Sequence, residues 1–220
     1  MTGIVLQARI DSSRLPGKAM LPLGGKPIIF RVMEVLNHIP ADLRILACTE
    51  DSLDLFKPLA QEAGFHTFAG PKDDVLERYC RVIRHFSLTR VIRATGDNPF
   101  VFADAASAIN TEAITLNADY AGYIGLPYGA GVESVSASAL LQAGDNAVSS
   151  FDREHVCPYL YNNPNLFRIH RPDAPTCWLY PDIRLTIDTQ EDYEKAVQLY
   201  ETLKDKPDRY NGQVIIYEFI

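Results

Sequence analysis

The start of the chain places a strand, a basic loop and a helix in immediate succession. The apolar run at residues 4–6 predicts a buried strand, and the polar segment that follows carries three cations, Arg9, Arg14 and Lys18. Backbone N–H groups in such a loop, together with fixed cations, form binding sites for phosphates. A solvated basic loop is the general alternative. Because this loop follows the first predicted β-strand, where α/β proteins bind ligands, we predict a phosphate site.

Strands and helices alternate through the first part of the chain. The pattern predicts strands at residues 3–8, 43–48, 65–69 and 90–95, and helices at residues 27–38, 52–64, 73–86 and 104–116. The first of these helices begins with Pro27, which suits a first helical turn. Repeated β-α units indicate an α/β fold with a mostly parallel, mixed central sheet and helices on both faces.

The pattern is less regular after residue 117. Strands are predicted at residues 119–124, 131–136, 166–170 and 184–187, and helices at residues 138–143, 150–161 and 189–203. The apolar tail at residues 212–220 is predicted to form an edge strand or a dimer contact. We expect a single domain over residues 1–220, with a nucleotide-binding half (1–117) and an acceptor-binding half (118–220) that can also support dimerisation.

Charge and composition exclude several classes of function. The 220 residues carry a net charge of -7, which argues against non-specific binding to nucleic acid or to an anionic membrane. An anionic substrate must then be attracted by a local patch. The chain has neither a basic n-region nor an apolar run of membrane-spanning length, so we expect a cytoplasmic protein. Its four cysteines lie far apart and are predicted to be reduced and mostly buried: Cys48, Cys80, Cys157 and Cys177.

Two aspartates follow predicted strands. Asp97 lies in the turn after residues 90–95, and Asp188 lies between residues 184–187 and the last long helix. Two carboxylates at neighbouring strand ends, facing a basic phosphate loop, suit Mg²⁺, which takes one or two carboxylates together with phosphate oxygens and water. The structural alternatives are a turn-forming residue for Asp97 and a helix N-cap for Asp188.

The motifs Gln7-Ala8-Arg9, Ser13-Arg14-Leu15-Pro16-Gly17-Lys18 and Gly25-Lys26-Pro27 resemble the N-terminal signature of cytidylyltransferases that activate acidic sugars. The chain is most similar to the SpsF-type members of spore-coat polysaccharide biosynthesis, and it also resembles CMP-N-acylneuraminate and CMP-Kdo synthetases. The Gly-Asp and Ile-Asp-Thr motifs of that family recur at Asp97 and Asp188.

The resemblance implies a Rossmann-like nucleotide-diphospho-sugar transferase fold of the glycosyltransferase-A type. It also implies CTP as co-substrate and Mg²⁺ bound by Asp97 and Asp188. Arg14 and Lys18 are expected to be catalytic because they would hold the triphosphate and stabilise the departing pyrophosphate. The residues expected to contact the nucleotide are Gln7, Ala8, Arg9, Ser13, Arg14, Lys18, Thr49, Gly70 and Asp97.

Four further residues are candidates for binding the acceptor sugar. Arg153 and His155 lie in an Arg-Glu-His-Val motif and are expected to pair with a sugar-acid carboxylate, although an ordinary amphipathic helix explains them equally well. Glu133 could accept hydrogen bonds from sugar hydroxyls or simply face solvent. Arg93 could point into the cleft or form a buried ion pair with an acid.

The sequence therefore predicts nucleotidyl transfer from CTP to a small acidic sugar, with a homodimer suggested by the resemblance. Three alternatives stay open. The first is a nucleotidyltransferase for a neutral sugar phosphate or polyol phosphate. The second is a glycosyltransferase of the same general fold, although Gly96-Asp97-Asn98 lacks the Asp-x-Asp metal motif of many such enzymes. The third is a non-catalytic nucleotide-binding partner in a surface-polysaccharide pathway.

Overall fold

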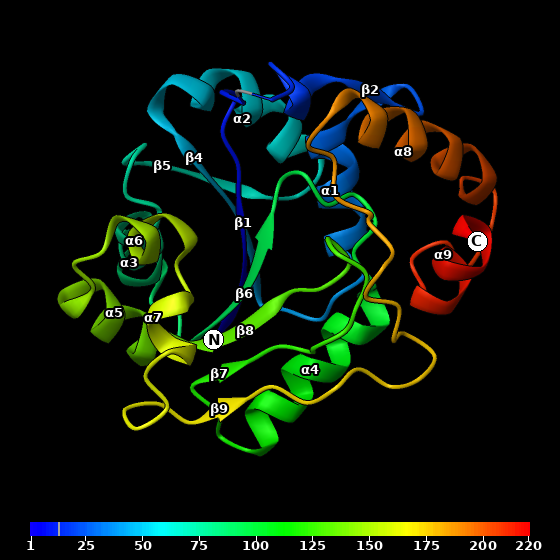
Figure 1. The fold of residues 1–220 in the computed structure, drawn as a ribbon. Helices are drawn as coiled ribbons and strands as arrows, with labels where there is room; N and C mark the ends of the chain where they lie inside the picture. Colours follow the sequence, from blue (N-terminus) through cyan, green and yellow to red (C-terminus); the bar gives the residue numbers. More distant parts are fainter. Residues whose placement is uncertain (13) are drawn as a thin grey trace.

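A mixed β-sheet runs through the middle of the molecule. The computed structural model describes residues 1–12 and 14–220, and within them the main sheet has seven strands in the order β5-β4-β1-β6-β8-β7-β9 (Figure 1). These strands are β1 (Thr2–Gln7), β4 (Leu43–Thr49), β5 (His66–Gly70), β6 (Arg90–Thr95), β7 (Tyr120–Ala121), β8 (Glu133–Ser136) and β9 (Ile169–His170). Strands β5, β4, β1 and β6 are parallel to one another, whereas β8 runs antiparallel to both β6 and β7. This arrangement confirms the predicted mostly parallel, mixed sheet.

Helices cover both faces of the sheet. Figure 1 shows α3, α5, α6 and α7 on one side and α1 and α4 on the other. The helices are α1 (Ile28–Leu36), α2 (Leu53–Glu62), α3 (Val75–Phe86), α4 (Ala103–Thr115), α5 (Ala137–Asn146), α6 (Ser150–His155), α7 (Pro158–Tyr161), α8 (Gln190–Leu203) and α9 (Gly212–Phe219). Two short 3₁₀ helices, Lys18–Met20 and Glu50–Ser52, and a small hairpin of β2 (Pro22–Leu23) and β3 (Lys26–Pro27) complete the elements.

The alternation of side chains along β1 divides the core into two layers. Ile4 and Leu6 pack with α1 and α4 residues on one face, while Val5 packs with α3 residues on the other. All three side chains are fully buried. Burying an aliphatic side chain of this size contributes about 1.5–3 kcal/mol, so both layers hold β1 in the centre of the sheet. The loop that follows β1 is therefore anchored at a fixed position.

Three secondary-structure predictions for the second half are wrong. Residues 184–187 form only a single bridge from Arg184 to Tyr128 and no regular strand. Residues 212–220 are predicted to form an edge strand or a dimer contact, and the strand is wrong: residues 212–219 form helix α9, because Asn211 caps it and Ile215 and Ile216 are buried. The predicted helix at residues 150–161 is two helices separated at Val156, whose φ of 73° breaks the helical path.

The cysteines agree with the prediction that most of them are buried. Cys48, Cys80 and Cys157 are buried and Cys177 is partly exposed, and all four are free thiols. Burial raises the pKa of Cys48 and Cys80 to about 11, which keeps both thiols protonated at neutral pH. In the parts of the chain that the structure describes, none of the helices combines the length and the apolar character that crossing a membrane requires.

Candidate active site

A cavity of about 720 Å³ opens where β1 and β6 end. Its wall includes the loop after β1, the turn after β6, the segment between β7 and β8, and parts of α6 and α7. Among the described residues, the lining carries six lysines and arginines against five acids, although the whole chain has a net charge of -7. The lining thus has a slight excess of positive charge in an acidic protein, which favours the binding of an anion.

Lys18 joins the two predicted carboxylates. Its Nζ lies 3.0 Å from Asp97 Oδ2 and 2.9 Å from Asp188 Oδ1, and it also donates to the Ile187 carbonyl at 2.8 Å. Gly17, with a φ of 66°, turns the backbone just before Lys18 and permits this approach. A loop near the N-terminus is therefore tied to a segment near the end of the chain by a single ammonium group.

Asp188 is surrounded by cations. Arg14 Nη2 lies 2.8 Å from Oδ1, and Arg184 Nη2 donates to Oδ2 at 2.7 Å. Burial alone would raise the pKa of Asp188, but hydrogen bonds from Lys18 and Arg184 outweigh it and hold the pKa below its ordinary value. The Asp188 carboxylate therefore offsets the repulsion between Arg14 and Lys18.

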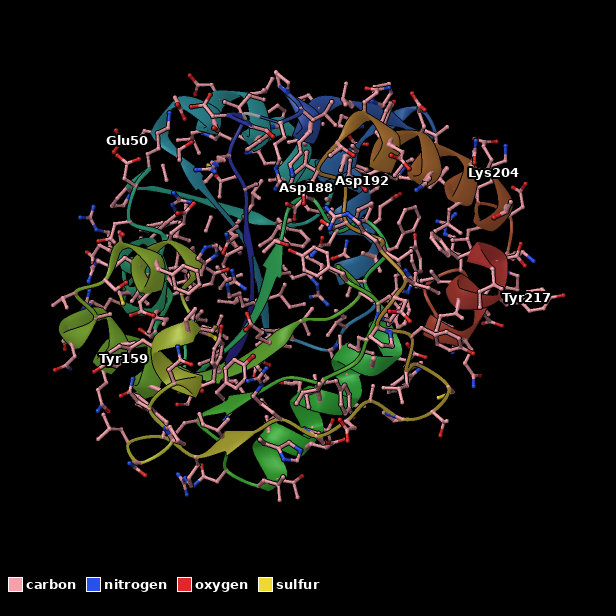
Figure 2. The ribbon with its side chains drawn as sticks, in the orientation of Figure 1. Glu50, Tyr159, Asp188, Asp192, Lys204 and Tyr217 are labelled. Carbon is pink, nitrogen blue, oxygen red and sulfur yellow. The ribbon has the colours of Figure 1, made fainter. Side chains whose placement is uncertain are left out.

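The backbone brings Asp188 beside Asp97. The Ile187 N–H donates to the Asp97 carbonyl at 2.9 Å, and Leu185 N–H donates to the Tyr128 carbonyl at 2.8 Å. At Gly129, whose φ is 96°, a Cβ atom would lie 2.6 Å from the Thr186 nitrogen, so the close approach of the two segments needs glycine. Figure 2 shows Asp188 and Asp192 next to each other where α8 begins.

The carboxylates of Asp97 and Asp188 fit a divalent cation. Oxygens of Asp97 and Asp188 already converge on one cationic nitrogen, and both side chains line the cavity. Within the described residues, no group of three or more His, Cys, Asp or Glu side chains is arranged to hold a metal. Two converging carboxylates match the needs of Mg²⁺, which completes its shell with phosphate oxygens and water.

Some of the residues predicted to contact the nucleotide line the cavity, whereas Thr49 and Gly70 do not. Gln7, Ala8 and Arg9 line the cavity together with Arg14, Lys18 and Asp97. Thr49 does not line it, because its buried hydroxyl lies 2.7 Å from that of Ser52, which in turn accepts a hydrogen bond from Ile10 N–H. Gly70 lies beneath Arg78, and a Cβ there would be 2.8 Å from Arg78 Cγ. Ser13, also predicted to contact nucleotide, lies outside the described residues.

Two further cations of the lining follow β5. Lys72 pairs with Asp11 in the loop after β1, and Arg78 Nε donates to the Pro71 carbonyl at 3.0 Å. The sequence contained a signal for Lys72, because it follows a parallel strand at the edge where ligands bind. Lys72 is not among the predicted site residues.

The acceptor candidates Arg93 and Glu133 face each other across β6 and β8. They are directly opposite in the antiparallel register, and Arg93 Nη1 donates to Glu133 Oε2. The Tyr120 hydroxyl donates to the other oxygen of Glu133 at 2.8 Å. All three residues line the cavity, and Tyr120 was not predicted there. Burial opposes the charge of Arg93, but the Glu133 carboxylate outweighs this effect and raises the pKa of the guanidinium above its ordinary value.

His155 and Arg153 have different environments although both belong to α6. His155 is exposed, lines the cavity and stacks against Phe151 with ring centroids 4.4 Å apart. Arg153 lies outside the lining residues. Its Nε donates to Asp74 at 2.7 Å and its Nη1 donates to the Ala147 carbonyl at 2.9 Å, so these contacts fix α6 against the start of α3.

A mostly parallel sheet with helices on both faces, a basic loop after β1 and two carboxylates beside that loop define a nucleotide-binding α/β fold. A family model described as cytidylyltransferase matches residues 3–215, so this chain belongs to the cytidylyltransferase family and is a nucleotidyltransferase. The predicted family resemblance is confirmed.

Relatives and solved structures are similar over most of the chain. The spore coat polysaccharide biosynthesis protein SpsF of Bacillus subtilis (strain 168) is 33% identical, over 96% of this chain and 91% of that protein. A cytidylyltransferase structure from Leptospira borgpetersenii serovar Hardjo-bovis superimposes with a TM-score of 0.87 at 25% identity, covering 98% and 92% of the two chains. CMP:2-keto-3-deoxy-manno-octonic acid synthetase, solved with CTP, has the same fold, with a TM-score of 0.70 at 17% identity over 91% and 98%. The predicted fold of the nucleotide-diphospho-sugar transferase type is thereby confirmed.

Proposed function

We propose that this protein transfers CMP from CTP to a hydroxyl group of a small acidic sugar. The observation that carries the proposal is the convergence of Lys18 and Arg14 with Asp97 and Asp188 at one cavity in a chain of the cytidylyltransferase family. In the reaction, the acceptor oxygen forms a bond to the α-phosphorus of CTP. The bond from that phosphorus to the bridging oxygen breaks, pyrophosphate leaves and the hydroxyl proton is released.

Such a reaction demands alignment and charge neutralisation more than covalent chemistry by the protein. Arg14 and Lys18 would bind the triphosphate and stabilise the negative charge of the departing pyrophosphate, and Arg9 would contact the nearer phosphate. Asp97 and Asp188 would hold Mg²⁺, which neutralises phosphate oxygens and lowers the pKa of a hydroxyl group that it binds. All five of these side chains line the same cavity.

The acceptor would occupy the part of the cavity beneath α6 and α7. Arg93, Glu133 and His155 line the cavity and offer hydrogen-bond donors and acceptors suited to a sugar. The relatives support this choice: SpsF is named for polysaccharide biosynthesis, and the synthetase solved with CTP is named for a sugar acid.

The test is pyrophosphate release in the presence of Mg²⁺, with CTP, UTP, ATP and GTP against acidic sugars, neutral sugars and sugar phosphates. We expect release that needs both CTP and an acidic sugar. Release with a sugar phosphate in place of an acidic sugar would replace this acceptor class by that of the first alternative. Nucleotide binding without release in any combination would contradict transferase activity and favour a non-catalytic role.

A further inference from the structure

The cavity lining contains an arginine, Arg93, with unused hydrogen-bonding capacity. Among the described residues, Glu133 is the hydrogen-bond partner of the Arg93 side chain, and only Nη1 makes that bond. Arg93 Nε is buried and has no partner. A guanidinium offers five N–H donors, so most of those of Arg93 are not used by the protein.

The geometry of the unused donors matters. Nε and the second terminal nitrogen form the side of a guanidinium that binds a carboxylate through two parallel hydrogen bonds. Glu133 occupies the other terminal nitrogen and leaves this side without a protein partner among the described residues. A buried donor without a protein partner is uncommon in folded proteins, and a bound ligand or a water molecule can supply the partner.

The surroundings keep Arg93 charged and in position. The opposite strand supplies Glu133, whose second oxygen accepts a hydrogen bond from Tyr120. Three neighbouring groups, Tyr79, Tyr120 and Cys157, are neutral at physiological pH, and burial raises the pKa of each further above its ordinary value. Arg93 is therefore balanced by a single carboxylate, and its side chain is 14% exposed where it lines the cavity.

Arg153, which the sequence favoured for the same role, lacks this capacity. Its guanidinium donates to Asp74 and to the Gly144 and Ala147 carbonyls, so all three of its nitrogens have protein partners. It is also absent from the cavity lining.

From these contacts we infer that Arg93, held by Glu133, is the group that binds the carboxylate of the acceptor sugar. The inference rests on the proposed function and adds to it the residue that distinguishes an acid from a neutral analogue. Glu133 acts as a positioning residue, because it orients the guanidinium and occupies the nitrogen that the ligand does not need. The ligand is a sugar acid whose carboxylate receives two hydrogen bonds from one arginine.

The test compares 3-deoxy-manno-octulosonate with its carboxamide in the wild-type protein and in variants. Arg93→Gln removes the guanidinium group that binds the carboxylate. The paired variant Arg93→Gln/Glu133→Gln avoids leaving a lone buried carboxylate. Arg153→Gln is the matched comparison on the other candidate arginine. Two quantities are measured: kcat/KM for pyrophosphate release from CTP, and the dissociation constant of each acceptor in the presence of α,β-methylene CTP.

We expect the wild-type protein to prefer the acid to the carboxamide by about 30-fold or more, as for other buried charge-assisted pairs. The paired variant should lose that preference in both measurements, whereas Arg153→Gln should keep it. Retention of the preference in a folded paired variant, or its loss in Arg153→Gln alone, would overturn the assignment of Arg93. A wild-type protein that uses a sugar phosphate and neither binds nor uses the acid would overturn the proposed acceptor class as well.

Discussion

Lys18 Nζ lies 2.9 Å from Asp188 Oδ1, although 170 residues separate the two in the sequence. Both side chains are largely buried, with exposed fractions of 15% and 8%. The pair ties the phosphate loop to the segment before α8, and Asp97 accepts a hydrogen bond from the same ammonium. Because one cation connects three segments of the site, its removal should affect both the chemistry and the geometry of the cavity.

Replacing Lys18 by Met should lower kcat for pyrophosphate release by about 100-fold or more. The substitution removes a preorganised positive charge and leaves Asp97 and Asp188 without their shared partner. Steady-state kinetics with CTP and Mg²⁺ measure the effect. Lys195→Met is a matched control, because Lys195 pairs with Glu191 on the exposed side of α8. Equal turnover in both variants would contradict the role of Lys18.

The lowered pKa of Asp192 predicts how the free energy of unfolding depends on pH. Asp192 forms a capping box with Thr189 at the start of α8 and accepts hydrogen bonds from Arg184. Burial opposes ionisation, but these bonds outweigh it and lower its pKa from 3.8 to about 2. A carboxyl whose pKa falls on folding stabilises the folded state above the unfolded pKa and loses that effect as pH falls through the folded value.

We therefore expect Asp192→Asn to lower the free energy of unfolding by about 2 kcal/mol at pH 7. The difference from the wild-type protein should shrink between pH 4 and pH 2. Urea titrations at several pH values measure it. Glu191→Gln, at an exposed neighbouring position, is the control and should change stability by less than about 0.5 kcal/mol. A pH-independent difference between Asp192→Asn and the wild-type protein would argue that the cap acts without its charge.

The β-α half of the fold could be predicted because each element has a strong periodic pattern. The strand predicted at residues 90–95 matches β6, and the helix predicted at 73–86 matches α3 within two residues. The strand prediction for residues 212–220 is wrong because their β-branched residues favour strands, while their environment favours a helix. The Gly212 N–H donates to Asp104, and a Cβ at Gly212 would lie 2.5 Å from Phe102, so tertiary packing overrides propensity.

The candidate site also contains residues that local sequence patterns predict and residues that only tertiary contacts place. Residues of contiguous motifs, such as Arg14, Lys18 and Asp97, line the cavity together. Residues whose placement depends on tertiary contacts could not be predicted. Nothing in the sequence around Arg153 shows that Asp74 lies beside it, and nothing around Tyr120 shows that its hydroxyl reaches Glu133. The metal, the acceptor and the homodimer stay predictions.

The end of α3 offers a test of backbone strain. Ser87 follows the helix with a φ of 52°, in the left-handed region that glycine adopts at little cost. Ser87→Gly should therefore raise the free energy of unfolding by about 0.5–1 kcal/mol. Ser107→Gly, within α4, should lower it by a similar amount. Thermal or urea unfolding measures both, and destabilisation by Ser87→Gly would indicate that the serine side chain has a role of its own.

Removal of the metal tests whether Asp97 and Asp188 hold a divalent cation. Chelation with EDTA should reduce pyrophosphate release to background, and excess Mg²⁺ should restore it, because phosphate oxygens need a second source of positive charge beside Arg14 and Lys18. Asp97→Asn should raise the Mg²⁺ concentration for half-maximal activity by about tenfold or more, since it removes one of two carboxylates. Asp145→Asn is the control, because Asp145 is 72% exposed and lies outside the cavity lining. Full activity in EDTA, or an unchanged Mg²⁺ requirement in Asp97→Asn, would show that the two carboxylates serve to hold Lys18 and not a metal ion.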